Sequence, residues 1–210
     1  MDTVTDITLR TLAISGTATL LATTWSLPLA YRLAVKGPRT VAEALESIVG
    51  IPTVLIGLLL YLLFSRHGPL GPLRLLYTPQ SIIIGESILI TPLLIGTLHR
   101  VITSLYDTYG ETAITLGATP SQARDTVLSE ALPTIAGSTI MAFSRATGEL
   151  GIALLVGGNL EGKTRTITTA IALDVSMGEF GDAIKLGLAL LAILIITSIL
   201  LNRFNKVSYR

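Results

Sequence analysis

Long uncharged stretches dominate the pattern of hydrophobic and polar positions in this chain. Three of them lie between charged residues at positions 10 and 32, 46 and 66, and 185 and 203. A helix that crosses the ~30 Å hydrocarbon core of a bilayer needs roughly 20 predominantly apolar residues. The stretches therefore predict transmembrane helices near residues 9–31, 46–64 and 183–202.

Two further apolar stretches contain charged residues. Residues 80–102 include Glu86, and residues 134–157 include Arg145 and Glu149. Even on the mildest scale, a charge at the centre of a bilayer costs about 2.5–3.5 kcal/mol. We therefore expect these two helices to face protein or water, which brings the number of predicted transmembrane helices to about five.

The composition agrees with a membrane protein. Of 210 residues, 50% are hydrophobic and 14% are charged, whereas a soluble domain has about 25% charged residues. The net charge of +1 gives no reason to expect a nucleic-acid surface. Because the chain has no cysteine, disulfides, thiolate metal sites and cysteine nucleophiles are excluded. We predict an all-α membrane protein in which residues 1–210 form one transmembrane domain.

The lysine and arginine residues favour an N-terminus outside the cell and a C-terminus in the cytoplasm, because basic residues concentrate in cytoplasmic loops. Six basic residues then lie outside, and eight lie inside: Arg32, Lys36, Arg39, Arg100, Arg124, Arg203, Lys206 and Arg210. With this orientation, residues 103–133 form a cytoplasmic connection and residues 158–182 form an outer loop.

The cytoplasmic connection contains two helix-compatible segments around a glycine. One segment precedes Gly117, and the other covers 121–128, with Thr119 or Ser121 as its N-cap and Pro120 in or near its first turn. The pattern predicts two short amphipathic helices around a bend. Composition alone is equally compatible with a helical hairpin that has no partner.

This connection resembles the EAA loop of importer-type (type I) ABC permeases, in which Glu-Ala-Ala is followed by three residues and a glycine. Glu111, Ala113 and Gly117 match, with Thr112 in place of the central alanine, while the Leu-Pro that ends the pattern comes three residues late. In that family the loop docks onto a cytoplasmic ATPase. The resemblance implies that Glu111, Ala113, Gly117 and Ala118 couple this chain to such a subunit, with the glycine allowing the bend.

Residues 145–171 resemble tungstate permeases and, more loosely, molybdate permeases. The resemblance is carried by Glu-Leu-Gly at 149–151, Val-Gly-Gly-Asn at 156–159, Thr-Arg-Thr at 164–166 and Thr-Thr-Ala-Ile at 168–171. It implies the permease subunit of an ABC importer that translocates an oxyanion, tungstate or molybdate. A permease for sulfate, phosphate or another small solute is the first alternative, and a channel or structural membrane protein is another.

The same resemblance implies the partners of the chain. These are a second copy in a homodimer, two copies of a separate ATPase that hold ATP and Mg, and an extracytoplasmic substrate-binding protein. The chain itself would bind no cofactor and no resident metal, and it would not be an enzyme.

Three charged residues are candidates for a translocation path or gate. Arg145 and Glu149 are four residues apart, so on one helix they share a face and can pair. Together with Glu86 they could form one network in the outer half of the bundle. Such a network either fastens helices together or offers an oxyanion a weak, escapable contact, as conduction requires.

The outer loop holds a second group of candidates. Asn159, Thr164 and Arg165 lie close together in sequence, and amides, hydroxyls and a guanidinium suit a tetrahedral oxyanion. The same residues could instead form a well-capped loop that contacts a binding protein.

A phosphate-binding motif overlaps this loop. Residues 157–164, from Gly157 to Thr164, fit G-x-x-x-x-G-K-[ST]. The motif needs a helix whose N-terminal amides cradle the phosphates, but residues 165–169 form a β-branched run that starts a helix poorly. Lys163 also lies outside the cell in the predicted orientation. A membrane-bound nucleotide-binding protein is therefore a remote alternative.

Overall fold

The computed structural model describes residues 2–208, except for the side chains at 39, 42, 43, 46 and 202–208, and within that range it contains helices and no strand. Arg210 lies outside the described residues. The α-helices are α1 (Val4–Lys36), α2 (Arg39–Ile48), α3 (Thr53–Phe64), α4 (Pro79–Leu105), α5 (Glu111–Thr115), α6 (Pro120–Thr147), α7 (Ile167–Met177) and α8 (Phe180–Ser208). One 3-10 turn, η1 (Gly71–Leu73), and two π-helical turns, η2 (Tyr106–Gly110) and η3 (Ala153–Gly157), complete the chain. The all-α prediction is confirmed.

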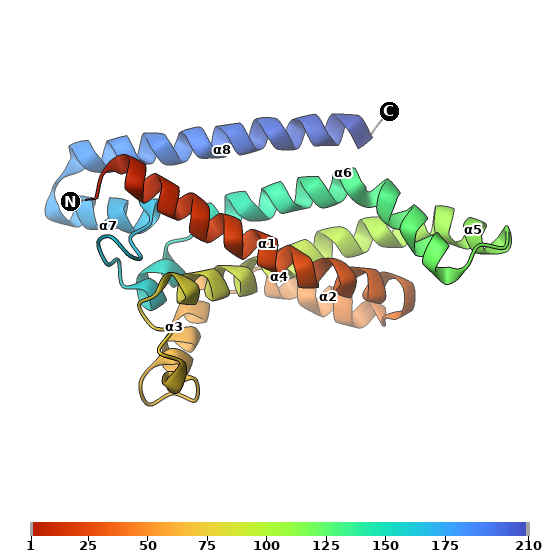
Figure 1. Cartoon of the computed structure of the whole chain (residues 1–210), viewed down its shortest axis with the longest axis horizontal. Coiled ribbons are helices and arrows are strands. Elements are labelled where there is room, and N and C mark those ends of the chain that lie inside the picture. Colours follow the sequence, from red (N-terminus) through yellow and green to blue (C-terminus); the bar gives the residue numbers. More distant parts are fainter. Residues whose placement is uncertain (1, 209–210) are drawn as a thin grey trace.

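Four helices, α1, α4, α6 and α8, run along the long axis of the molecule (Figure 1). The segments long and apolar enough to cross a bilayer are Val4–Lys36, Pro79–Thr115, Pro120–Thr147 and Phe180–Leu201. The N-terminus, α7 and the start of α8 lie at one end of the molecule, and α5 lies at the other (Figure 1). These four helices correspond to four of the five predicted spans.

The remaining predicted span, 46–64, is divided in the structure. The helix α3 has 12 residues, about 18 Å at 1.5 Å per residue, which is less than the ~30 Å of the hydrocarbon core. Gly50 and Pro52 lie in the break between α2 and α3, and proline disrupts a helix interior because it lacks an N–H donor and clashes with the preceding turn. Two short helices, α2 and α3, therefore take the place of the predicted span, and α3 points away from the bundle axis (Figure 1).

The predicted helix at 134–157 is also interrupted in the structure. The helix α6 ends at Thr147, where Gly148 forms the C-cap, and a new short helix covers residues 151–157. The Glu149 carboxylate accepts a hydrogen bond from the backbone N–H of Ile152 at 3.2 Å and so satisfies a free donor at the start of that helix. Glu149 therefore lies in a break between two helices.

The predicted outer loop, residues 158–182, is not wholly a loop, because it contains α7. The expectation that a β-branched run would start a helix poorly is wrong here. Thr166 and Thr169 form a reciprocal capping box at the start of α7, with the backbone N–H of Thr166 donating to the Thr169 hydroxyl at 2.9 Å. Capping bonds of this kind offset low intrinsic propensity.

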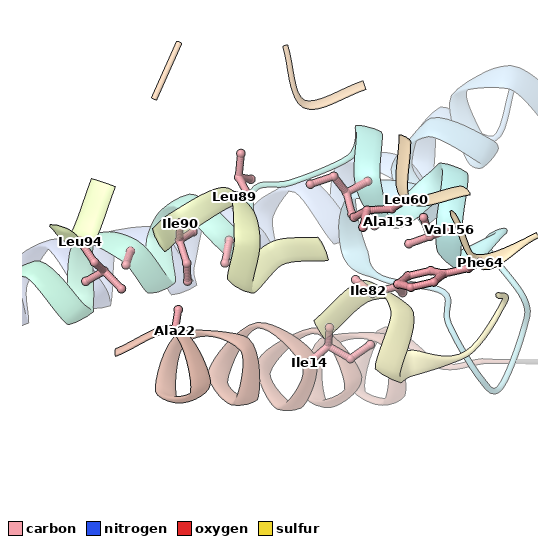
Figure 2. Packing of buried hydrophobic residues seen from close by; sticks show 13 residues of the cluster. Ile14, Ala22, Leu60, Phe64, Ile82, Leu89, Ile90, Leu94, Ala153 and Val156 are labelled. Atoms are coloured by element: carbon pink, nitrogen blue, oxygen red, sulfur yellow. The ribbon is translucent and has the colours of Figure 1, made fainter. Parts of the chain in front are cut away.

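A buried hydrophobic cluster joins α1, α3, α4 and the 151–157 helix. Figure 2 shows Ile14 of α1 and Ile82 of α4 in this cluster with Phe64 of α3 and Val156. Close approach is possible because Gly85 of α4 has no side chain: a Cβ there would lie 2.4 Å from the Ile152 side chain. The cluster holds α3 and the 151–157 helix against α1 and α4, near the end of the bundle that carries the N-terminus (Figure 1).

Candidate functional site

Residues 106–133, termed the hairpin, form one end of the molecule. The helix α4 continues through η2 into α5, and the chain then reverses and enters α6 (Figure 1). The predicted short helices are therefore the extensions of two long ones. Val127 and Ala131 of α6 are buried in a cluster with Ile102 of α4 and Ala30 of α1, so the base of the hairpin is fixed to the bundle.

The reversal of the hairpin depends on one glycine and one cap. Gly117 has a φ of +92°, a left-handed conformation that other residues adopt only at a cost of roughly 1–2 kcal/mol. The N–H of Ala118 donates to the Ala113 carbonyl at 2.9 Å and closes the turn. Thr119 and Gln122 then cap α6 reciprocally. The predicted bend at Gly117 and the Thr119 cap with Pro120 at the start of the helix are confirmed.

The tip of the hairpin exposes apolar side chains. Leu116 is 83% exposed, and Ile114 and Tyr109 are also exposed. Glu111 lies beside them on the surface, while Ala113 and Ala118 are half-buried. Exposed apolar groups at the end of a rigid element are typical of a protein-binding surface. Sequence reasoning missed Leu116 and Ile114 as candidates, although their position directly before Gly117 was a usable signal.

At the other end of α6, Arg145 and Glu149 form an ion pair with an Nη1–Oε2 distance of 3.0 Å. The Arg145 side chain is 43% exposed, whereas that of Glu149 is 3% exposed. The pair does not lie on one helical face, because α6 ends between the two residues. The backbone of Glu149 is also fixed, because the Thr168 hydroxyl donates a hydrogen bond to the Glu149 backbone carbonyl at 2.7 Å.

Glu86 lies in α4 and is buried. Its carboxyl group is beside Ser15 of α1 and close enough to Glu149 for the two carboxylates to repel each other when both are charged. Among the described residues, no hydrogen-bond partner is found for its Oε2 atom. The structure thus brings Glu86 near Glu149, while Arg145 pairs, among the described residues, with Glu149 only.

The loop at 157–166, where the predicted outer loop begins, is closed by Thr164. This buried hydroxyl donates to the Gly157 carbonyl at 2.6 Å and accepts from the Leu160 N–H at 2.9 Å. Asn159 has a left-handed φ of +51°. Within the described part of the chain, its Oδ1 atom and the Arg165 Nε atom are buried without hydrogen-bond partners. The loop therefore uses Thr164 internally and leaves polar capacity on Asn159 and Arg165.

Residues near the N-terminus fasten this loop to α1, a contact that sequence reasoning did not identify. The Asp2 carboxylate accepts from both Arg10 terminal nitrogens, at 2.9 and 3.1 Å, and from the Gly162 N–H at 2.9 Å. Arg10 also donates to the Arg165 carbonyl at 3.1 Å. Hydrogen bonds from Arg10 and from the Gly162 N–H lower the pKa of Asp2 from 3.8 to about 2.

Replacing Asp2 with alanine should accelerate amide hydrogen exchange at Gly162. A hydrogen bond to a charged group contributes about 1.5–3 kcal/mol, which corresponds to roughly 10- to 100-fold faster exchange if local opening limits the rate. Because folding lowers the pKa of Asp2, its contribution is complete above the unfolded value of 3.8 and is lost as the pH falls through about 2. Protection in the native chain should therefore not change between about pH 5 and 8 once intrinsic exchange is corrected for.

The control for this experiment is Asp182→Ala, which removes an exposed ion pair with Lys185 at the start of α8. Equal exchange rates at Gly162 in the native chain and in Asp2→Ala would show that the contact does not hold the loop.

The phosphate-binding motif does not have the required surroundings. No strand is present in residues 2–208, Thr164 is engaged inside the loop, and the next helix begins only at Ile167. Backbone amides at a helix N-terminus are therefore not placed directly after Lys163, as phosphate binding would need. The geometry does not support the nucleotide-binding alternative.

Comparison with known proteins places these features in context. A family described as "Binding-protein-dependent transport system inner membrane component" matches residues 18–209. The chain is 37% identical over 183 residues to a tungstate uptake system permease protein, TupB, from Peptoclostridium acidaminophilum, covering 86% of this chain and 80% of the relative. It is 32% identical to a probable anion ABC transporter permease protein from Haloferax volcanii (95% and 89% covered). It is 28% identical to a molybdenum transport system permease protein, ModB, from Azotobacter vinelandii (93% and 92% covered).

Proposed function

The chain belongs to the family of binding-protein-dependent transport system inner membrane components, and from this premise we propose that it carries tungstate across the membrane as the permease subunit of a type I ABC importer. The family and the apolar helices make it a multi-pass membrane protein and a transport subunit. The observation that supports tungstate is the similarity to a tungstate uptake permease over most of both chains. Molybdate is the nearest competing substrate, because a molybdenum permease is similar over 93% of this chain and 92% of its own length.

The hairpin is the element that we propose to meet the ATPase. It combines a fixed base with an exposed apolar tip. Its two sides are continuous with α4 and α6, which carry Glu86 and Arg145. A displacement of the tip would therefore move the helices that hold the charged residues, and ATP binding by the partner could bias the permease between two arrangements.

The charged residues at the far end of α4 and α6 are our candidates for the path. Arg145 is partly exposed and can offer a guanidinium to a passing dianion, while the Glu149 carboxylate 3.0 Å away competes for it. A contact weakened in this way releases the ion, as conduction requires. Asn159 and Arg165 lie half-buried in the loop at 157–166, where the Asn159 amide N–H groups and the Arg165 guanidinium are donors that suit an oxyanion, and we propose that they meet the ion, or the protein that delivers it, first.

The assembly follows from the same proposal. Two copies of the chain, two ATPase subunits and an extracytoplasmic binding protein would form the transporter, with the N-terminus outside and the hairpin inside. No cofactor or metal need be held by this chain, since ATP and Mg belong to the ATPase.

Uptake by the reconstituted transporter tests the substrate. Proteoliposomes that contain the permease, its ATPase and its binding protein should accumulate tungstate when ATP is present, and molybdate should compete better than sulfate. Uptake of sulfate or phosphate that tungstate does not inhibit would contradict the proposal and favour a permease for another solute. Solute flux without ATP would indicate a channel.

A further inference from the structure

A cavity of about 730 Å³ opens at the hairpin end of the bundle, between the last turns of α1 and the first turns of α6. None of the functions proposed above uses it. Its volume lies within the ~300–1,000 Å³ of typical ligand sites, and a single tetrahedral oxyanion would fill only a small part of it. The lining therefore has to be considered for a larger ligand.

One wall of the cavity is apolar and firmly held. Leu27 and Val35 of α1 and Leu128 of α6 contribute to it, together with the ring of Tyr31. Leu27 and Tyr31 also pack against the buried cluster at the base of the hairpin. This wall is consequently preformed, and it offers a surface to hydrocarbon.

The rim of the cavity is basic. Arg32 and Lys36 stand four residues apart on α1, and Arg124 lies opposite on α6. Arg124 is paired with Asp125 at 2.7 Å, whereas Arg32 and Lys36 have no ion-pair partner among the described side chains. Three cations and one carboxylate leave two positive charges in excess at the cavity.

The position of the rim along α1 suits the edge of a bilayer. The helix has 33 residues, about 50 Å at 1.5 Å per residue, which exceeds the ~30 Å hydrocarbon core and the ~40–45 Å that includes the headgroups. Arg32 and Lys36 lie in its last two turns, where long basic side chains reach the headgroup layer. A basic rim above an apolar wall at this depth is complementary to an anionic lipid.

We propose that this cavity binds an anionic phospholipid, with the phosphate at Arg32 and Lys36 and the upper acyl chain along the wall formed by Leu27 and Leu128. The proposal goes beyond transport. It rests on the transport proposal in one respect only, namely the leaflet of the bilayer that supplies the lipid. Lipid binding itself requires neither the ATPase nor a substrate. Loss of lipid binding and loss of tungstate uptake are therefore separate results.

The chain can carry a fluorescent reporter for this lipid. Trp25 is its only tryptophan, and it is 39% exposed. Its indole N–H donates to the Thr91 hydroxyl of α4 at 2.8 Å, and Trp25 lies about 200° around α1 from Leu27, so it does not face the cavity. Tyr31 lines the cavity, and the variant Trp25→Phe/Tyr31→Trp moves the single tryptophan there. Brominated acyl chains that enter the cavity should then quench its fluorescence.

The experiment titrates this Trp25→Phe/Tyr31→Trp chain, in neutral detergent micelles, with brominated phosphatidylglycerol or brominated phosphatidylcholine. We expect phosphatidylglycerol to quench the tryptophan at a lower mole fraction than phosphatidylcholine does. The double variant Arg32→Gln/Lys36→Gln should weaken this preference by about fivefold for each charge removed. Asp125→Asn should strengthen it, because it removes the carboxylate that occupies Arg124.

The matched control is Arg66→Gln/Arg74→Gln, which removes two arginines from a different cavity, near the end of α3. This control should keep the native preference. Equal quenching by the two lipids in the reporter chain without further substitutions, or the same loss in the control, would overturn the proposal. Displacement of the lipid by an equal concentration of inorganic phosphate would also overturn it, in favour of a free-anion site. Absence of quenching by either lipid would assign the cavity to a second copy of the chain or another protein.

Discussion

Replacing Leu116 with aspartate should abolish ATP-driven uptake without unfolding the permease. Leu116 is 83% exposed in the isolated chain, so the substitution removes little packing within this subunit. If the tip docks into the ATPase, the leucine is buried there and contributes about 1.5–3 kcal/mol. Its loss, together with the cost of burying a carboxylate, should weaken ATPase binding by at least roughly 10- to 100-fold. Co-purification of the ATPase and substrate-stimulated ATP hydrolysis measure this effect.

The control is Leu73→Asp, which adds the same charge at another exposed leucine, in η1 between α3 and α4. It should leave ATPase binding unchanged. If Leu116→Asp retains the ATPase as well as the control does, the tip of the hairpin is not the docking surface.

Replacing Arg145 with methionine should strongly slow tungstate uptake while the complex still assembles. Removing a charge-assisted contact costs about 1.5–3 kcal/mol, or roughly 10- to 100-fold in rate if the contact acts in the rate-limiting step. The substitution also leaves the buried Glu149 carboxylate without its partner, and an orphaned buried charge is itself destabilising. A single variant therefore cannot separate a role in the path from a role in stability.

The double variant Arg145→Met/Glu149→Gln separates the two roles. It removes both charges of the ion pair, so no carboxylate of that pair is left buried and uncompensated. We expect thermal unfolding to return toward the native temperature while uptake stays slow. If uptake recovers together with stability, the ion pair only stabilises the break in the chain after α6 and has no role in the translocation path.

Local signals in the sequence predicted the hairpin well. A glycine in a left-handed turn and a threonine cap before proline are determined by neighbouring residues, and the structure has them at Gly117 and Thr119. The exposed leucine at the tip was not identified, because hydropathy counts a leucine as buried wherever it occurs. Exposure of this kind follows from how far the hairpin extends beyond the bundle (Figure 1).

The breaks in the helices were not predicted. Averaged hydropathy registers how many apolar residues a stretch contains, and it does not register a single Pro52 or Gly148 that interrupts the backbone. The helix α7 was missed for a related reason, because the capping pair Thr166 and Thr169 offset the low propensity of its first turn. The contact between Asp2 and Gly162 joins residues 160 positions apart, and no local pattern indicates it.

One residue can report directly which side of the membrane the hairpin tip faces and whether the ATPase covers the tip. Because the chain contains no cysteine, Leu116→Cys introduces a single thiol at the tip. In sealed membranes a maleimide that cannot cross the bilayer should label this thiol only from the cytoplasmic side, and assembly with the ATPase should protect it. Labelling from the outside, or equal labelling with and without the ATPase, would contradict the account.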